Sequence, residues 1–167
     1  ESAAKMFLGG GGLATKYLYD EVKKGADPLG PDNELIFMTG PLTGTPCPSA
    51  GRYSVVGKSP LTGTWAQANS GGFWAPEFKR TGYDGVIFQG ISPKPVYLYI
   101  DHDTIHIGDA RPLWRLDTWE AAEYLKKVLN DDDIQIMVIG PGGENGALFG
   151  CIMTDRDHAA GRTGMGT

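Results

Sequence analysis

The chain has 167 residues, enough for one domain with a substantial core, and a formal net charge of −5. An acidic balance without a basic run argues against a nucleic-acid partner. No apolar run approaches the roughly 20 residues of a membrane span and no signal peptide is recognisable, so we expect a cytoplasmic location without membrane association. Glycine is the outlier, with 25 residues. This is about twice its usual fraction of roughly 7% and predicts many tight backbone sites.

Residues 5–24 show the apolar spacing of a helix, interrupted by four glycines at 9–12. These glycines are either a phosphate loop leading into a helix N-terminus or a tightly packed entry to the helix. They lack the Lys-Ser/Thr of a P-loop, and no strand is visible before them. The sequence leaves both interpretations open.

A strand expected at residues 35–39 leads into a long loop at 40–72. The phrase Pro-Leu-Thr-Gly-Thr occurs in it twice, at 41–45 and 60–64, with one strand expected between the copies at 53–57. Loops this rich in Gly, Pro, Ser and Thr leave backbone N–H groups free and let the chain approach a ligand closely. With Arg52 at its centre, the segment suits an anionic, hydrogen-bonding ligand such as a phosphate or a pterin. The alternative is an ordinary pair of hairpin turns.

The remaining elements are predicted as a helix at 73–80, strands at 85–88, 134–139 and 147–153, and a hairpin of 96–100 with 104–107. Asp117, with Glu120 three residues later, predicts the capping box of a second long helix. Cys47 and Cys151 do not have the spacing of a metal site, so we expect free thiols, with a disulfide as the lesser alternative. His102, His106 and His158 do not have ligand spacing either.

Two segments share an order of features. Residues 35–41 and 135–141 each read as a strand ending in Gly-Pro, each follows an amphipathic helix containing Tyr-Leu, and each precedes a glycine-rich loop and Ala-Gly-Arg. This order predicts an internally duplicated α+β domain whose two β-sheet/helix halves are related by a pseudo-twofold axis. Arg52 and Arg162 would then serve a ligand with two similar halves. Chance similarity of short strands, and ordinary surface arginines, are the alternatives.

Three segments, residues 40–52 (GPLTGTPCPSAGR), 59–90 and 139–166, resemble the N-terminal domain of the aldehyde ferredoxin oxidoreductase family of tungsten bis-pterin enzymes. The resemblance covers nearly the whole chain. It implies an α+β domain at residues 1–167 that forms the platform under a tungstopterin. In that family two pterin dithiolenes hold one tungsten, and a magnesium ion bridges their phosphates.

The family's motifs imply roles for individual residues. Arg52 matches an arginine that lies between a pterin and the iron–sulfur cluster, and Arg162 matches the arginine of the other pterin. Thr163 stands where a glycine is often found, and its backbone contact survives if its φ is negative. The expected cofactor-binding residues are Arg52, Asn69, Ser70, Gly71, Gly72, Arg162, Thr163 and Gly164. The expected magnesium contacts are the backbone carbonyls of Asn69 and Thr163, and no catalytic residue is expected.

The resemblance also implies what surrounds this chain. Both of its ends look cut, and the family's cluster cysteines and the groups near tungsten belong to domains outside it, so we expect an inactive fragment. The full anaerobic enzyme would oxidise aldehydes to carboxylic acids and pass electrons through a [4Fe–4S] cluster to ferredoxin. Its partners would be ferredoxin, its own remaining domains and possible further copies of itself. The alternative functions are that of a related aromatic acyl-CoA reductase subunit and that of a non-catalytic phosphate- or nucleotide-binding module.

A few other polar residues lie in these motifs. Glu144 and Asn145 are either site residues or part of a turn with a cap. Asp155, Arg156 and His158 are charged loop residues that we expect to be structural.

Overall fold

The main sheet of the molecule has four antiparallel strands in the order β3-β2-β1-β4. This computed structural model describes residues 2–167. The strands are β1 (Glu34–Thr39), β2 (Tyr53–Lys58), β3 (Trp65–Ser70) and β4 (Gly85–Gln89). The register places Tyr53 opposite Ser70 at one end of the β2–β3 pair and Lys58 opposite Trp65 at the other. The polar loops that join these strands therefore gather at the two ends of the sheet.

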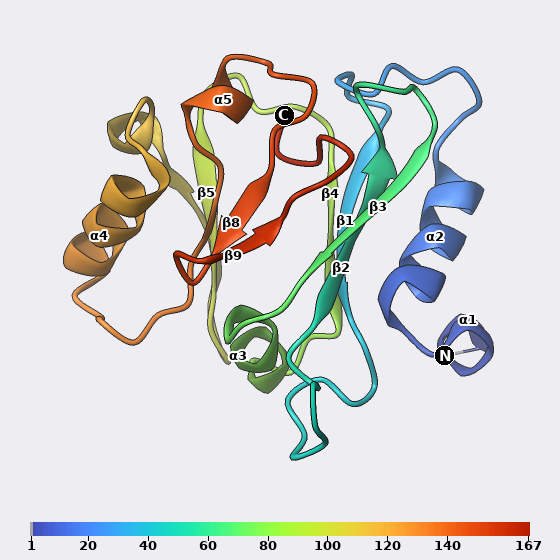
Figure 1. Cartoon of the computed structure of the whole chain (residues 1–167), viewed down its shortest axis with the longest axis horizontal. Helices are drawn as coiled ribbons and strands as arrows, with labels where there is room; N and C mark the ends of the chain where they lie inside the picture. Colours follow the sequence, from blue (N-terminus) through green and yellow to red (C-terminus); the bar gives the residue numbers. More distant parts are fainter. Residues whose placement is uncertain (1) are drawn as a thin grey trace.

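Both faces of this sheet are covered (Figure 1). Helix α1 (Ser2–Phe7) precedes α2 (Gly10–Glu21), and α2 packs Leu13, Ala14 and Leu18 onto one face. The other face packs against a second antiparallel sheet of β7 (Met137–Val138), β8 (Ile152–Thr154) and β9 (His158–Ala160). Because successive strand residues point to opposite faces, a strand between two covered faces is apolar on both, as β1 is.

The remaining elements lie around this double layer. They are α3 (Trp74–Arg80), the hairpin β5 (Val96–Ile100) and β6 (Ile105–Asp109), the 3₁₀ turn η1 (Arg111–Leu113), α4 (Thr118–Leu129) and α5 (Pro141–Glu144). Asp117 accepts hydrogen bonds from the Trp119 and Glu120 amides, and the Glu120 side chain accepts one from the Asp117 amide. The predicted capping box is confirmed.

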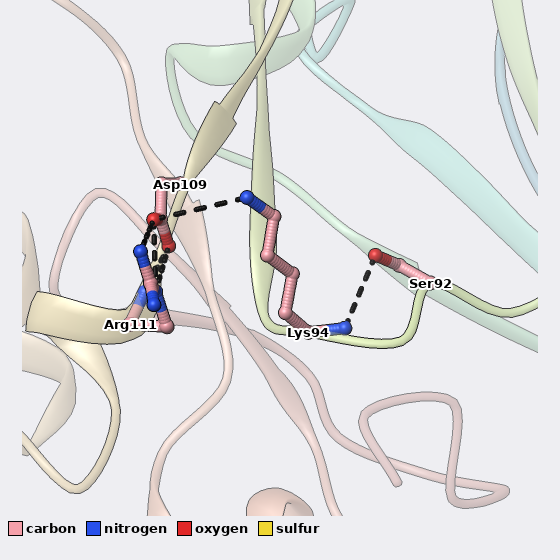
Figure 2. A network of polar contacts seen from close by, with 4 residues as sticks. All are labelled: Ser92, Lys94, Asp109 and Arg111. Atoms are coloured by element: carbon pink, nitrogen blue, oxygen red, sulfur yellow. Dashed lines mark hydrogen bonds and ion pairs between the residues drawn. The ribbon is translucent and has the colours of Figure 1, made fainter.

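A polar network closes the base of the β5–β6 hairpin (Figure 2). Arg111 donates to both carboxylate oxygens of Asp109, from Nε to Oδ1 at 3.1 Å and from Nη2 to Oδ2 at 2.6 Å. Lys94 Nζ lies 3.9 Å from Oδ2. These hydrogen bonds and the two positive charges lower the pKa of Asp109 to about 2. The network is exposed, so salt screens it and its role is to hold the hairpin to η1.

The predicted α+β class is confirmed, and most of the expected elements are present. Four element predictions are wrong in part. The glycines at 10–12 lie inside α2, and 65–70 is a strand, not loop. The expected strand at 134–139 is paired only over Met137–Val138, and 147–151 forms turns before β8.

Both cysteines are free, with Cys47 exposed. Within residues 2–167 no helix is long and apolar enough to cross a bilayer.

The two segments of the predicted repeat differ in what lies inside them. No helix or strand lies between β1 and Ala50, whereas α5, β8 and β9 lie between β7 and the end of the second Ala-Gly-Arg. The strands that end in Gly-Pro thus correspond in sequence pattern, while the loops that follow them fold differently.

Candidate functional site

Arg52 and Asn69, both singled out from the sequence, are neighbours. Arg52 lies just before β2, and Asn69 lies near the end of β3, where its register partner is Ser54. The Arg52 guanidinium donates a hydrogen bond from Nη2 to Asn69 Oδ1, and both side chains are exposed. They line a pocket of about 290 Å³ together with Gly10, Met38, Gly40, Tyr53 and Ser54. Two predicted residues from separate parts of the chain thus meet at one pocket, whose lining also includes the apolar side chain of Met38.

The first Pro-Leu-Thr-Gly-Thr segment holds Arg52 in place. The buried Thr43 donates from Oγ1 to the Arg52 carbonyl at 3.1 Å and accepts from the Gly40 amide at 3.0 Å. The Gly44 amide donates to the Ala50 carbonyl at 3.0 Å, and Gly44 has a φ of 79° that suits glycine. These internal hydrogen bonds order the loop and fix the backbone position of Arg52. Thr43 was missed by sequence reasoning, although the repeated phrase contains it.

The start of α2 contributes to the same pocket. Its N-cap, Gly9, has a φ of 133° and provides no side-chain hydrogen bond, and Gly10 lines the pocket beside Arg52. The first N–H groups of a helix have no partner within the helix, and its N-terminus carries partial positive charge. The glycines at 10–12 form the first turn of the helix, and Gly11 is closely packed, because a Cβ there would lie 2.5 Å from the Gln67 side chain. Anion binding at this turn stays a prediction.

The segment after Asn69 runs from β3 into α3. Ser70 is buried, 4% exposed, opposite Tyr53 in the sheet. Burial raises the pKa of the Tyr53 phenol. Gly72 has a φ of 90°. This segment therefore presents the Asn69 side chain and backbone groups at the surface. It does not present the Ser70 hydroxyl.

Arg162 lies apart from this pocket. It is exposed and follows β9, while Gly164 is buried against Pro60 and the Leu148 carbonyl. Since His158 lies beside Gly71 and Met165 beside Gly57, the chain from β9 onward runs along the sheet from one end of β2 to the other. Among residues 2–167 no hydrogen bond or ion pair joins Arg162 to Arg52 or Asn69. The two predicted arginines therefore lie in two separate loops, Arg52 beside the start of α2 and Arg162 after β9.

Thr163 does not meet the condition set for it. Its φ is 73°, in the left-handed region where a β-branched residue is rare, so the requirement of a negative φ fails. Its side-chain hydroxyl donates a hydrogen bond to the carbonyl of the preceding residue, Arg162. The backbone at this position has the conformation that a glycine would adopt without strain.

Side chains grouped to bind a metal are lacking in the part of the chain that is described. Residues 2–167 contain no group of three or more His, Cys, Asp or Glu side chains placed to hold a metal. The remaining predicted polar residues make internal contacts. Glu144 accepts from the Arg115 amide, Asn145 donates to the Pro141 carbonyl, and Asp155 accepts from the Phe73 and Trp74 amides. What this surface offers a ligand is a cation, an amide and backbone groups.

The chain is similar to known proteins over nearly all its length. The profile of the family described as aldehyde ferredoxin oxidoreductase, N-terminal domain, matches residues 1–167. The chain is 48% identical to a tungsten-containing aldehyde ferredoxin oxidoreductase of Thermococcus kodakarensis and 46% identical to one of Pyrococcus furiosus, in each case over 99% of this chain and 27% of the relative. Among solved structures, a chain of the active site complex BamBC of benzoyl coenzyme A reductase, in complex with 1,5-dienoyl-CoA, superposes with a TM-score of 0.96 at 42% identity. That likeness covers 99% of this chain and 25% of the other. The chain thus spans about a quarter of the length of the relatives it matches, and it belongs to the aldehyde ferredoxin oxidoreductase family as an N-terminal domain.

Proposed function

We propose that this chain is the tungstopterin-binding platform of an enzyme that oxidises aldehydes to carboxylic acids and passes electrons through a [4Fe–4S] cluster to ferredoxin. The observation that carries the proposal is the Arg52–Asn69 pair in its pocket. It joins two residues that the resemblance assigns to one cofactor, and it lies in a member of a family whose named relatives contain tungsten.

The residues present fit such a cofactor. Pterins carry amide-like edges that need backbone donors and acceptors, and their phosphates favour arginine and exposed N–H groups. The pocket provides Arg52, Asn69 and the helix start at Gly10, and Gly40 and Ser54 also line it. Magnesium prefers oxygen ligands, and the backbone carbonyl of Asn69 is a proposed contact. The Thr163 carbonyl stays a proposed contact despite its positive φ, because the backbone there has the conformation of the glycine often found at this position. The bound cofactor supplies the two-electron chemistry, while these residues bind and orient it.

A second loop is proposed for the second pterin. Arg162, Thr163 and Gly164 follow the second Ala-Gly-Arg and form a separate loop along the same sheet. The internal duplication, with its pseudo-twofold axis, would explain why the two arginine loops share their preceding sequence pattern. Ser70, Gly71 and Gly72 are also part of the proposed cofactor site, with Gly71 and Gly72 as backbone contacts.

The partners follow from the same proposal. Ferredoxin is the proposed acceptor, further domains of the same enzyme hold the [4Fe–4S] cluster, and the enzyme works in an anaerobic cytoplasm. A homo-oligomer is compatible with these assignments.

One rival function has an observation in its favour. A solved chain with a TM-score of 0.96 comes from a complex named benzoyl coenzyme A reductase. The same platform in this protein would then serve reduction of an aromatic acyl-CoA. Assays of the full-length protein distinguish the two functions: aldehyde oxidation is followed with an oxidised viologen as electron acceptor, and aromatic acyl-CoA reduction with a reduced viologen as electron donor.

Replacing Arg52 tests the proposed platform. We expect Arg52→Ala in the full-length protein, purified without oxygen, to lower the pterin content per chain by about tenfold, because a charge-assisted contact to the cofactor is lost. Arg52→Lys should restore part of it, since lysine keeps the charge but not the planar fork. Arg80→Ala is the matched control, because Arg80 is exposed on α3 and pairs with Glu77. An unchanged pterin content in Arg52→Ala would contradict the proposal.

A further inference from the structure

The turn between β8 and β9 has an unusual backbone. Asp155 and Arg156 are consecutive non-glycine residues with φ values of 51° and 65°. Non-glycine residues rarely adopt this region, and they persist there when their surroundings hold them. Both side chains of this turn are indeed held, each by a different part of the fold.

Asp155 reaches across to the segment that follows Asn69. Its Oδ2 accepts hydrogen bonds from the Phe73 amide at 2.5 Å and the Trp74 amide at 3.3 Å. A Cβ added at Gly72 would overlap this same oxygen. The carboxylate thus fills the space beside Gly72 and fixes the chain between the sheet and α3.

Gly72 in turn touches the Arg52 loop. A Cβ at Gly51 would lie 2.8 Å from the Gly72 carbonyl oxygen, so the two backbones are in close contact. Asp155, Gly72 and Gly51 therefore form a continuous chain of contacts that ends one residue before Arg52. It passes directly behind the pair of Arg52 and Asn69.

Arg156 anchors the turn on its other side. It forms an ion pair with Glu123 of α4, and its guanidinium lies 5.4 Å from the centre of the Trp119 ring. The carboxylate of Asp155 is thus presented from a turn that is itself fastened to α4. If the turn were not attached to α4, it could move together with residues 72–74 and would not hold them in place.

We propose that Asp155 is a positioning residue for the cofactor pocket, which locks residues 69–74 against the Arg52 loop. This inference rests on the proposed function, because it assigns Asp155 a purpose at the same pocket. Hydrogen bonds to a carboxylate are stronger than those between neutral groups. Their loss frees the Asn69 carbonyl and the backbone of Gly71 and Gly72 to move, and a small misplacement of binding groups is costly.

The test compares three variants of the full-length protein, purified without oxygen. Asp155→Ala removes both hydrogen bonds, whereas Asp155→Asn keeps an oxygen that can accept them. Asp157→Ala is the matched control, because Asp157 is an exposed carboxylate in the same turn. The measurements are amide hydrogen exchange of residues 69–74, the pterin and magnesium content per chain, and the electron paramagnetic resonance signal of the tungsten centre.

We expect Asp155→Ala to speed exchange at Phe73 and Trp74 by about tenfold or more, since hydrogen bonds to charged groups contribute on that order. Pterin and magnesium content should fall several-fold and the resonance signal should broaden. Asp155→Asn should restore all of these toward the parent values, and Asp157→Ala should change none. If Asp155→Ala does not fold, Asp155→Ser withdraws the carboxylate with a smaller loss of volume and is expected to give the same pattern.

Three outcomes overturn the proposal in different ways. Unchanged exchange in Asp155→Ala or Asp155→Ser shows that the carboxylate does not hold the segment. Faster exchange with parental pterin content and resonance signal shows a purely structural role. A parent protein that contains no pterin overturns the proposed function, whereas a loaded parent with an equally loaded variant overturns only the role of Asp155.

Discussion

Thr163 stores backbone strain at a position that the proposed cofactor loop needs. A φ of 73° in a β-branched residue costs about 1 to 3 kcal/mol, and the surrounding loop maintains it because Gly164 and Met165 are buried. A carbonyl presented from this conformation differs in direction from one presented at negative φ. Thr163 therefore lowers the stability of the fold, while its backbone keeps a defined geometry beside Arg162.

We expect Thr163→Gly to raise the stability of the full-length protein by about 1 kcal/mol, because glycine adopts this φ without strain. Thermal unfolding of the two proteins measures the difference. Thr64→Gly is the control, since Thr64 lies in an exposed turn without a positive φ and should lose stability instead. A Thr163→Gly protein that unfolds at a lower temperature than the parent would show that the strain assignment is wrong.

Residue patterns predicted some of the site and not the rest. Arg52 could be found because an arginine at the centre of a glycine-rich loop is conspicuous, whereas Asn69 was assigned through the family resemblance. Thr43 could not, because a threonine hydroxyl that supports a backbone carbonyl looks like any other turn residue. The positive φ of Thr163 could not be predicted either, because the neighbouring Gly164 packs against Pro60, which is distant in the sequence.

At the scale of elements, the junction of α2, β1 and β4 contains a buried carboxyl group. Glu34 on β1 is 5% exposed, and its Oε2 is buried without a hydrogen-bond partner. Gln89 Nε2 on β4 donates to Glu34 Oε1 at 2.5 Å and also to Glu21 of α2 at 3.3 Å. Burial, with the nearby Glu21 charge, raises the pKa of Glu34.

This junction predicts a pH dependence. Because the folded-state pKa of Glu34 lies above the unfolded one, the unfolded chain loses its proton first as the pH rises, and stability falls through that window. We therefore expect Glu34→Gln to stabilise the protein at neutral pH, with a gain that disappears below about pH 4.3. Thermal unfolding at several pH values checks this, with the exposed Glu77→Gln as control. A gain that is independent of pH would contradict the explanation.

Element prediction succeeded where local chemistry decides the outcome. The Asp117–Glu120 capping box and the apolar run of β1 are local signals, and both elements formed as expected. β3 was missed because its buried positions are the small residues Ala66, Ala68 and Ser70, which carry little hydrophobic signal. Its strand character comes from pairing with β2, which is tertiary context.

At the scale of the whole molecule, the second sheet packs against one face of the first. The core between them joins Phe37 and Tyr53 to Ile152 and Ala160, and Asp155 adds a polar link from the second sheet to α3. The Arg52 pocket lies at the end of the first sheet on the side of α2, and the Arg162 loop follows the second sheet, so this core lies between them. A platform for one ligand with two similar halves requires a fixed separation of its two loops.

Metal and pterin analysis of the full-length protein, purified without oxygen, tests the central claim most directly. The platform account predicts about two pterins per tungsten in the parent protein, and loss of both when Arg52 and Arg162 are replaced together by alanine. Well-folded protein with neither pterin nor tungsten would contradict the account and favour a non-catalytic phosphate-binding module instead.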